Sequence, residues 1–409
     1  MDKTTTFVGQ HIFAQILTLS SKNCLSPIIK KAKADRYYKS IKSWDHFVSM
    51  MFGVLSGCTS LREICISMEA MDGKLNHLGI EKAPARSTLS DANKNRSSAV
   101  FGQIYQCLYE RYKPDLSDST LPVSVREKLF IIDSTVFSLF KAVLRTSGKH
   151  AADGKKKGGI KKNTMLEASS LMPVLIQFNA AADNDQQFLK FIELPEGSYL
   201  TFDKGYNNYQ QYARFTKLKI YFISRQKDNA VYKSVSEKLL NADTPDSVLK
   251  DEVIELTYKD ETKKKQVLQL RRIAWWDKEE HRVYEFVTNN FELEAKTIAD
   301  IYQYRWQIEL FFKKLKQNCP LAYFVGDNQN AIEIQIWYSL IAILLVTVIH
   351  STNKSKMAFS NLMTLIRIHL TNQISLKELI ALHNKKRHRG KKPRGQQALF
   401  VENQPPSFW

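Results

Sequence analysis

Residues 302–317, "YQYRWQIELFFKKLKQ", have the pattern of an amphipathic helix rich in aromatic residues and lysines. An α-helix turns about 100° per residue, so Tyr302, Arg305, Glu309 and Lys316 would project within an arc of about 60°. The apolar residues fall on the adjoining side of this helix: Ile301, Ile308, Phe311, Phe312 and Leu315. A solvated face needs no such alignment, and a core face would not carry a glutamate between two cations. We therefore expect a helix whose charged ridge borders a buried face.

The charge of the chain points to a polyanionic partner. Its 409 residues include 60 Lys and Arg against 41 Asp and Glu, which gives a net charge of +19 and a pI near 9.5. Nucleic acid is the commonest large polyanion in cells. An anionic membrane surface is the alternative, but no single amphipathic helix concentrates the basic residues. The length suggests two or three domains, and a hydrophobic content of 44% is enough for a sizeable core.

Three further features predict a cytoplasmic protein with no membrane partner. The five cysteines contain no CxxC pair, which argues against a disulfide framework or a zinc site. The start, "MDKTTTFVGQHIF", lacks the apolar core of a signal peptide. The longest apolar run, Ile336–Ile349, has 14 residues. A membrane span needs about 20, so we expect a buried helix.

The predicted elements indicate a mixed α/β fold. Helical periodicity fills the first part of the chain, and short β-branched runs such as "KLFIIDSTVFSLF" follow it. A later stretch alternates apolar and polar residues, as antiparallel strands with one wet face do. We expect a helical N-terminal domain over residues 1–120 and an α/β core over residues 121–218 and 291–370. A β-rich insertion would occupy residues 219–290, and a basic tail residues 371–409.

Three acidic residues are candidate metal ligands. Asp133 follows the apolar run "LFII", Asp203 follows "SYLTF", and Glu309 lies on the charged ridge. Oxygen ligands on rigid elements suit magnesium, and two ions about 3.5–4 Å apart can promote phosphoryl transfer. Taken singly, such residues are also common as turn caps or surface ion pairs. Asp183 and Asp185 are alternative ligands.

The spacing Tyr302-x2-Arg305-x3-Glu309-x6-Lys316 resembles the Y-x2-R-x3-E-x6-K signature of the cut-and-paste DDE transposases of bacterial insertion sequences. "IIDST" resembles the first-aspartate strand of that family, and "FDKGYNNY" its second-aspartate block. The two aspartates are 70 residues apart, and the glutamate follows 106 residues later, an interval in which the family carries a mainly β insertion. The resemblance covers about residues 121–353.

This resemblance implies an RNase H-like core in which Asp133, Asp203 and Glu309 hold two Mg²⁺ ions, for which Mn²⁺ can substitute. It implies double-stranded DNA as partner, with cutting at the transposon's terminal inverted repeats, a hairpin intermediate and joining to target DNA by a synaptic homodimer. Tyr302, Arg305 and Lys316 would grip the phosphates beside the scissile bond.

The hairpin implied by the resemblance requires a base to be pulled from the stack by an aromatic side chain of the β insertion. Aligning "YEFVTNN" on the family gives Tyr284 this role, at a position where tryptophan is common. Trp275 and Trp276 are alternatives. All three aromatics are also plausible as packing residues of the insertion itself.

Two basic segments are candidate DNA contacts. "GKKKGGIKKNT", Gly154–Thr164, predicts a loop that reaches the DNA backbone through Lys161 or Lys162, or else a solvated run of charge. The tail "NKKRHRGKKPRG", residues 384–395, contains Gly and Pro that resist regular structure, and it could add DNA affinity or support dimerisation.

The N-terminal helices suggest a reader of the terminal repeats. Ser60 and Ser87 are suited to cap two successive helices, and the second helix carries polar side chains suited to bases and phosphates. This pair could form a helix-turn-helix-like unit. A helical packing domain is the alternative. The residues assigned to end recognition are Asn93, Lys94, Asn95 and Arg96.

Other classes of protein share parts of these patterns. An RNase H-like nuclease without strand transfer would share the three acidic residues but would not need the insertion. A catalytically inactive DNA-binding regulator would not need the three acidic residues. A tyrosine recombinase would need an Arg-His-Arg-His-Tyr arrangement, for which we find no match.

Overall fold

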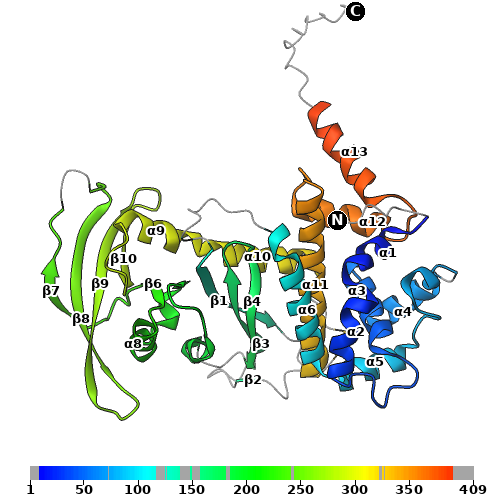
Figure 1. The fold of residues 1–409 in the computed structure, drawn as a ribbon, viewed down its shortest axis with the longest axis horizontal. Coiled ribbons are helices and arrows are strands. Elements are labelled where there is room, and N and C mark those ends of the chain that lie inside the picture. Colours follow the sequence, from blue (N-terminus) through cyan, green and yellow to red (C-terminus); the bar gives the residue numbers. More distant parts are fainter. Residues whose placement is uncertain are drawn as a thin grey trace, which may run out of the picture.

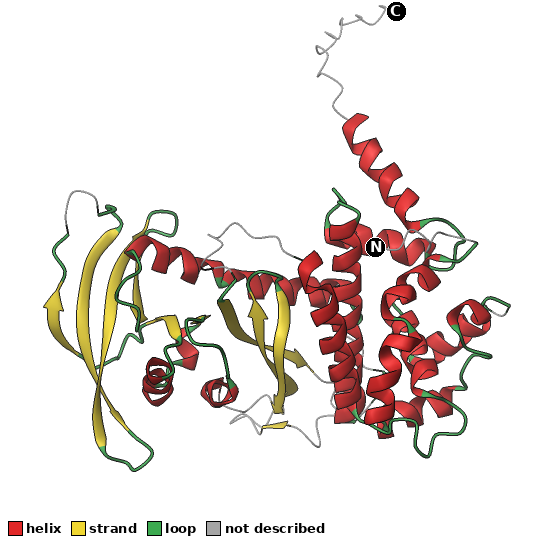
Figure 2. Ribbon diagram, in the orientation of Figure 1, coloured by secondary structure: helices red, strands yellow, loops and turns green. Residues whose placement is uncertain are grey.

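The protein combines a helical half with a half built on one large sheet (Figure 1, Figure 2). The mixed α/β fold predicted from the sequence is confirmed in this general form. The structure is a computed structural model, and it describes residues 9–71, 73–116, 125, 127–138, 148–149, 157–180, 185–240, 244–321, 325–326 and 328–389.

The first part of the chain is helical, as its periodicity predicts. Its α-helices are α1 (Ile12–Leu17), α2 (Lys22–Lys31), α3 (Ser43–Ser56), α4 (Leu61–Glu69), α5 (Arg86–Asn95) and α6 (Ser98–Tyr112), with short 3-10 helices η1 (Thr18–Ser20), η2 (Leu75–Leu78) and η3 (Lys113–Asp115). Ser60 caps α4 as predicted, because its side chain accepts a hydrogen bond from the backbone N–H of Glu63. The cap predicted at Ser87 is wrong, since α5 begins one residue earlier and Ala85 precedes it.

Helix α11 (Gln329–Thr352) contains the long apolar run and joins the two halves of the molecule. It packs against α3, α5 and α6 on one side and against α10 and α12 on others. It is long and apolar enough to cross a membrane, but 83% of its most apolar window is buried inside the protein. The prediction of a buried helix is therefore confirmed. One hydrophobic cluster runs from the N-terminal helices through α11 to the sheet.

Ten strands of the described residues form the sheet: β1 (Leu129–Ser138), β2 (Gly148–Lys149), β3 (Lys157–Glu167), β4 (Met172–Ala180), β5 (Tyr199–Phe202), β6 (Tyr221–Arg225), β7 (Lys233–Glu237), β8 (Val248–Lys259), β9 (Lys265–Asp277) and β10 (Arg282–Thr288). Their order is β2-β3-β1-β5-β6-β10-β9-β8-β7, and β4 pairs with the other edge of β3. The 3-10 helices η5 (Asp185–Phe191) and η6 (Lys204–Tyr206) and helix α8 (Tyr209–Lys217) lie between β4 and β6 in sequence.

Strand β6 differs from its prediction as an antiparallel strand of the insertion with one wet face. It pairs with β5 in parallel, and its three central residues are buried. Because β6 pairs with β10 on its other side, strands β10, β9, β8 and β7 extend the same sheet. Strands β8 and β9 pair in antiparallel register up to Lys259 and Lys265, so the residues between them form a hairpin turn.

The ridge predicted on one helix lies on two consecutive helices, α9 (Ala295–Tyr304) and α10 (Trp306–Asn318). Arg305 is the turn residue between them, and its backbone N–H donates to the carbonyl of Tyr302 at 3.1 Å. Helices α12 (Phe359–His369) and α13 (Leu376–Arg389) follow α11. The basic tail was predicted to lack regular structure from residue 384, but α13 continues to Arg389; residues 390–409 lie outside the described part.

A buried polar network fastens α3 to the end of α5. His46, which is fully buried, accepts a hydrogen bond at Nδ1 from Arg96 at 2.9 Å, and its Nε2–H donates to the side-chain carbonyl of Asn93 at 2.8 Å. These partners suit the neutral imidazole. Burial, and then the charge of Arg96, lower the pKa of His46 to about 3. The pKa of the buried His11 is also lowered, to about 4, mainly by burial.

We expect the protein to lose stability as the pH falls below about 6.5, the ordinary pKa of histidine in an unfolded chain. The folded pKa of His46 is depressed, so its neutral form stabilises the fold above about pH 6.5, and protons bound by the unfolded state remove that stability at lower pH. The free energy of unfolding should fall by about 1 kcal/mol between pH 7.5 and pH 5.5 from this residue. Urea unfolding followed by circular dichroism measures it. His46→Gln, which can donate and accept but does not titrate, should show a shallower dependence; an equal dependence would contradict the assignment to His46.

Candidate active site

Three charged residues lie next to one another because three adjacent strands are parallel and in register. Ile132 of β1 pairs with Phe202 of β5, and Phe202 pairs with Ser224 of β6. The next residue along each strand is Asp133, Asp203 and Arg225, respectively. Strand β1 continues past Asp133 to Ser138, but its pairing with β5 ends at Ile132. This register therefore places the two aspartates side by side.

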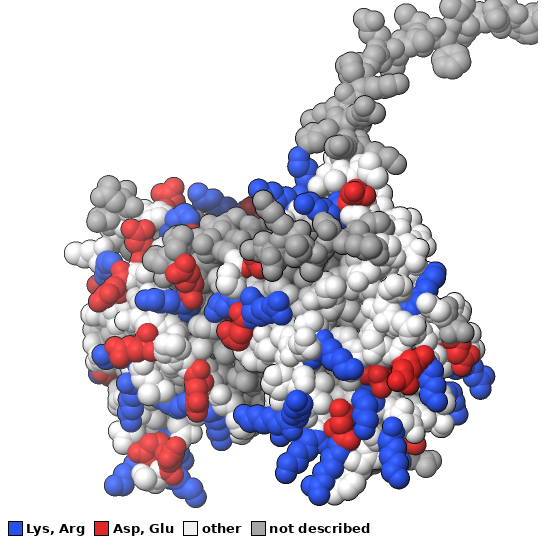
Figure 3. Space-filling view, turned by 45° about the vertical axis from the view of Figure 1, so that its right-hand side comes forward, with Lys and Arg blue, Asp and Glu red and all other residues white. Residues whose placement is uncertain are grey.

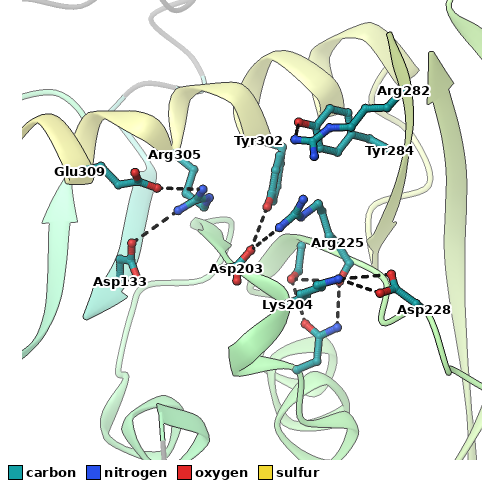
Figure 4. A network of polar contacts seen from close by, with 12 residues as sticks. Asp133, Asp203, Lys204, Arg225, Asp228, Arg282, Tyr284, Tyr302, Arg305 and Glu309 are labelled. Atoms are coloured by element: carbon teal, nitrogen blue, oxygen red, sulfur yellow. Dashed lines mark hydrogen bonds and ion pairs between the residues drawn. The ribbon is translucent and has the colours of Figure 1, made fainter. Parts of the chain in front are cut away.

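Arg305 lies between two of the three candidate ligands (Figure 4). Its guanidinium donates to Asp133 at 3.5 Å and to Glu309 at 3.2 Å. Glu309 is in the first turn of α10, where the positive end of the helix dipole favours a carboxylate. The Arg305 side chain is 11% exposed and that of Asp133 is 21% exposed, so this ion pair is formed largely away from water, whereas the Glu309 side chain is 36% exposed.

Asp203 is held by a different pair of side chains (Figure 4). The guanidinium of Arg225 donates to its carboxylate at 3.0 Å, and the Tyr302 hydroxyl donates to the same oxygen at 3.3 Å. The Arg225 guanidinium lies 5.8 Å from the centre of the Tyr302 ring and 5.6 Å from that of Tyr284. Asp203 is thus held by one cation and one tyrosine hydroxyl, and two aromatic rings lie beside that cation.

The two aspartates have opposite electrostatic environments. Burial raises the pKa of Asp133 to about 6; the Ser134 backbone N–H and Arg305 oppose this shift, and the negative charges of Glu309 and Asp203 add to it. Burial also acts to raise the pKa of Asp203, but the hydrogen bond and charge of Arg225 outweigh it, and the net pKa is lowered. Asp133 is therefore the easier of the two aspartates to protonate.

The three carboxylates line one open cavity of about 580 Å³. Its walls combine acidic, basic and aromatic side chains, which include Asp133, Asp203, Arg225, Trp275, Arg282, Tyr284, Tyr302, Arg305, Trp306 and Glu309. A neighbouring hollow of about 490 Å³ continues past Asp133 and Glu309 to Lys316, which is exposed. The ridge residues predicted from the sequence therefore face two connected hollows that share Asp133 and Glu309.

In this structure the three carboxylates lie too far apart to coordinate one metal ion together. Across the described residues, no group of three or more His, Cys, Asp or Glu side chains is close enough to hold one ion. The reason is visible in the contacts, since guanidinium groups stand between the carboxylates where a cation would be attracted. Of the alternative ligands, Asp185 begins η5 and does not line either hollow, and Asp183 lies outside the described residues.

Strand geometry places the three candidate base-flipping aromatics on two different faces of the sheet. Tyr284 of β10 and Trp275 of β9 are directly paired, so both point to the same face of the sheet, and both line the cavity. Trp276 follows Trp275 in the strand and points to the opposite face, with its ring 6.5 Å from that of His281. Tyr284 lies nearest the ridge, with its ring 6.5 Å from that of Tyr302.

The lysine-rich segment is not the loop that the sequence predicts. From Lys157 it forms strand β3, which lies between β1 and β4, so Lys162 pairs with Thr135 on one side and Phe178 on the other. Lys162 is 0% exposed, and burial lowers its pKa to about 7. The prediction that Lys162 contacts DNA is therefore wrong for this structure. The side chain of Lys161 and residues 154–156 lie outside the described part.

The four residues assigned to end recognition divide into two pairs. Asn93 and Arg96 are buried, at 1% and 2% exposure, and belong to the network around His46. Their predicted contact with DNA is wrong, because their polar atoms make hydrogen bonds inside the protein. Lys94 and Asn95 are exposed at the end of α5 and remain candidates.

Arg225 is a site residue that the sequence analysis missed. It directly follows Ser224, the last residue of β6 that pairs with β5, just as Asp133 and Asp203 directly follow the last pair of β1 with β5; that position is the signal that would have found it. Arg282 was also missed; it lies in the cavity wall with its guanidinium 4.3 Å from the centre of the Tyr284 ring.

Comparison with known proteins identifies the family. Residues 125–345, more than half of the chain, match the family model described as the transposase DDE domain, so the chain belongs to that family. Residues 8–81 match a second family, described as a domain of unknown function. The resemblance to insertion-sequence DDE transposases found from the sequence is thus confirmed.

Individual relatives agree with this assignment. The chain is 29% identical to a protein of Sinorhizobium fredii named as transposase y4zB, over 67% of this chain and 74% of that one. It is 27% identical to a Synechocystis protein named as a transposase for insertion sequence element IS4SA, over 73% and 80%. A piggyBac transposase solved in a synaptic complex with hairpin DNA covers 94% of this chain and 83% of its own, at 10% identity and a TM-score of 0.45, too weak a likeness to establish a shared fold.

We expect Arg96→Met to lower the free energy of unfolding by about 3 kcal/mol, because it leaves His46 and two backbone carbonyls without their donor inside the protein. Lys94→Met removes an exposed charge from the same helix and should change stability by less than about 0.5 kcal/mol. Urea unfolding of both variants measures the difference. Equal stability of the two variants would mean that Arg96 is not a structural residue.

Proposed function

We propose that this protein is a DNA transposase that cuts at the ends of its insertion sequence by metal-dependent phosphoryl transfer and joins those ends to target DNA. The observation that carries the proposal is the convergence of Asp133, Asp203 and Glu309 in one cavity from segments far apart in the chain. Family membership supports DNA transposition as the process. We propose the bacterial cytoplasm, where the DNA lies, as its place of action.

The strand arrangement supports an RNase H-like catalytic core. Strands β4, β3 and β1 are antiparallel neighbours, and β1, β5 and β6 are parallel ones, which is the order β4-β3-β1-β5-β6 expected of that fold. In this proposal Asp133 lies on the central strand and Asp203 at the end of its parallel neighbour. Helix α10, which contacts β1, supplies Glu309.

The donor set fits magnesium, although its present geometry does not. Three carboxylates around one cavity are hard oxygen donors, and the guanidinium groups between them occupy positions that favour positive charge. Asp133, Asp203 and Glu309 would hold two Mg²⁺ or Mn²⁺ ions. When bound, such ions activate an attacking oxygen and stabilise the leaving oxygen of the phosphodiester.

The chain's own residues would bind and orient the DNA. A guanidinium offers a planar pair of donors to phosphate oxygens, and Lys316 offers a point charge in the neighbouring hollow. If Arg305 moves from the carboxylates to a phosphate flanking the scissile bond, it releases Asp133 and Glu309 to the ions. Tyr302 and Arg225 would release Asp203 in the same way. DNA binding and metal binding would then support each other.

A hairpin intermediate is supported by the aromatic wall of the cavity. Tyr284 and Trp275 flank the space next to Asp203, and either ring could stack on a base drawn from the duplex. The opposite orientation of Trp276 makes it the weakest of the three candidates.

Lys94 and Asn95 remain candidates for contacts with the terminal repeats, and a synaptic homodimer remains part of the proposal.

A nuclease that cuts without strand transfer, or an inactive DNA-binding regulator, would give different products. Incubation with labelled DNA carrying the terminal repeats and divalent ions separates these functions. Sealed hairpins and joined products support a transposase. Simple nicks would favour the nuclease, and binding without any cutting would favour the regulator.

We expect Asp133→Asn, Asp203→Asn and Glu309→Gln each to lower the rate of cutting by more than about a thousandfold, because residues that act as a unit fail together. DNA affinity should stay within a few-fold of the original protein. Asp228→Asn is a matched control, since Asp228 is 88% exposed and pairs with Lys204 outside the cavity. Cutting by any of the three variants at the control's rate would refute that ligand.

We expect Arg305→Met to bind Mn²⁺ at least about 5-fold more tightly than the original protein in the absence of DNA, since it removes a cation that competes for Asp133 and Glu309. Calorimetric titration with Mn²⁺ measures this affinity. Arg305→Lys keeps the charge and should remain near the original value. Weaker Mn²⁺ binding by Arg305→Met would mean that Arg305 organises the carboxylates and does not compete with metal.

A further inference from the structure

The connection between α2 and α3 carries a dense, exposed positive charge. We call residues 30–42 the basic turn. Six of its side chains are basic and exposed: Lys30, Lys31, Lys33, Arg36, Lys39 and Lys42. Asp35 is the one acidic residue in this stretch, and its carboxylate accepts hydrogen bonds from the backbone N–H and hydroxyl of Ser43, at 2.6 and 2.7 Å. Figure 3 shows Lys and Arg side chains gathered along the lower edge of the half that holds the N-terminal helices.

The basic turn is built on a buried cation. Arg96 donates to the carbonyls of Ala34 at 3.2 Å and Ile41 at 3.0 Å, so it fixes the backbone near both ends of the turn. Its guanidinium also lies 4.1 Å from the centre of the Tyr38 ring and 3.6 Å from Asp35. Asp35 is therefore compensated from within the protein. The outward face of the turn keeps its full positive charge on a rigid support.

Tyr37 stands out within the basic turn. Its side chain is 85% exposed, and its φ of +70° is unusual for a residue other than glycine. The Arg36 guanidinium lies 4.8 Å from the centre of its ring. An exposed ring on left-handed backbone contributes little packing and costs free energy, and such strain is concentrated at functional sites. Lys33, at φ +49°, has the same kind of backbone.

We propose that the basic turn binds the sugar-phosphate backbone of double-stranded DNA, with Tyr37 as an aromatic contact between its flanking cations. The inference rests on the proposed function for the identity of the polyanion. It places DNA contact within residues 8–81, outside the transposase domain match, and it assigns Arg96 the role of positioning the turn from inside. The turn would contribute to DNA affinity but not to the cutting reaction, because it includes none of the residues that line the cavity.

The first test distinguishes the contribution of the Tyr37 ring to DNA binding from the effect of its backbone conformation on stability. Glycine adopts positive φ without strain, so Tyr37→Gly should leave the urea-unfolding midpoint unchanged or raise it. The same variant should bind a 30-base-pair duplex about 3-fold or more weakly in a fluorescence-anisotropy titration, as expected for loss of one contact from Tyr37 to the DNA backbone. A lower unfolding midpoint together with unchanged DNA affinity would give Tyr37 a purely structural role and overturn its part of the proposal.

The second test removes charge from the basic turn. The double variant Arg36→Ala with Lys39→Ala should weaken binding to the duplex roughly 10-fold at 0.15 M salt and reduce the slope of log affinity against log salt by about 2. The matched control is Lys264→Ala with Lys265→Ala, which removes two exposed lysines at the β8–β9 hairpin. Equal weakening by the control would mean that net charge and not the turn governs binding. Unchanged binding by the turn variant would also overturn the proposal.

Cutting assays keep this inference separate from the proposed function. A protein that binds the duplex through the basic turn but never cuts terminal-repeat DNA would refute the catalytic proposal alone. Normal cutting and binding by the turn variant would refute the turn alone. If the turn variant loses binding only to vesicles of anionic phosphatidylglycerol and not to DNA, the partner of the turn is a membrane surface and the proposal fails.

Discussion

The site depends on one electrostatic constraint: three carboxylates share a partly buried cavity and must be compensated by positive charge. In this structure Arg305 compensates Asp133 and Glu309, while Arg225 compensates Asp203. The result is a stable arrangement in which each candidate metal ligand already has a cationic partner. Such charges are costly to bury alone, so any process that removes the arginines must supply other cations.

The sheet and the helices each position part of this charged cluster. The parallel register of β1, β5 and β6 sets two aspartates and Arg225 side by side with no contribution from the helices. The junction of α9 and α10 then delivers Arg305 and Glu309 from above. Because α10 also packs on α11, the position of Glu309 depends on the same hydrophobic cluster that holds the N-terminal helices. The half that holds the candidate site and the helical half are therefore not independent in stability.

Buried polar residues explain why the N-terminal half was harder to interpret than the site. Asn93 and Arg96 have the chemistry of DNA-contacting residues, but both satisfy hydrogen bonds within the protein. Their burial stabilises the connection between α2 and α3, and the exposed charge lies on that connection. Lys162 is a similar case in the sheet, where a lysine expected in a DNA-contacting loop is fully buried on β3, between β1 and β4.

Residue spacing and periodicity alone were enough to predict the family, the mixed α/β class, the buried α11 and the ridge residues, because they are local properties of the chain. They also placed the strands around both aspartates nearly correctly. Three findings required the folded structure: Arg225 joins the site, β6 extends the core sheet, and Lys162, Asn93 and Arg96 are buried. Those facts depend on which strands and helices become neighbours, and a charged residue at the surface and one enclosed by distant elements look the same in sequence.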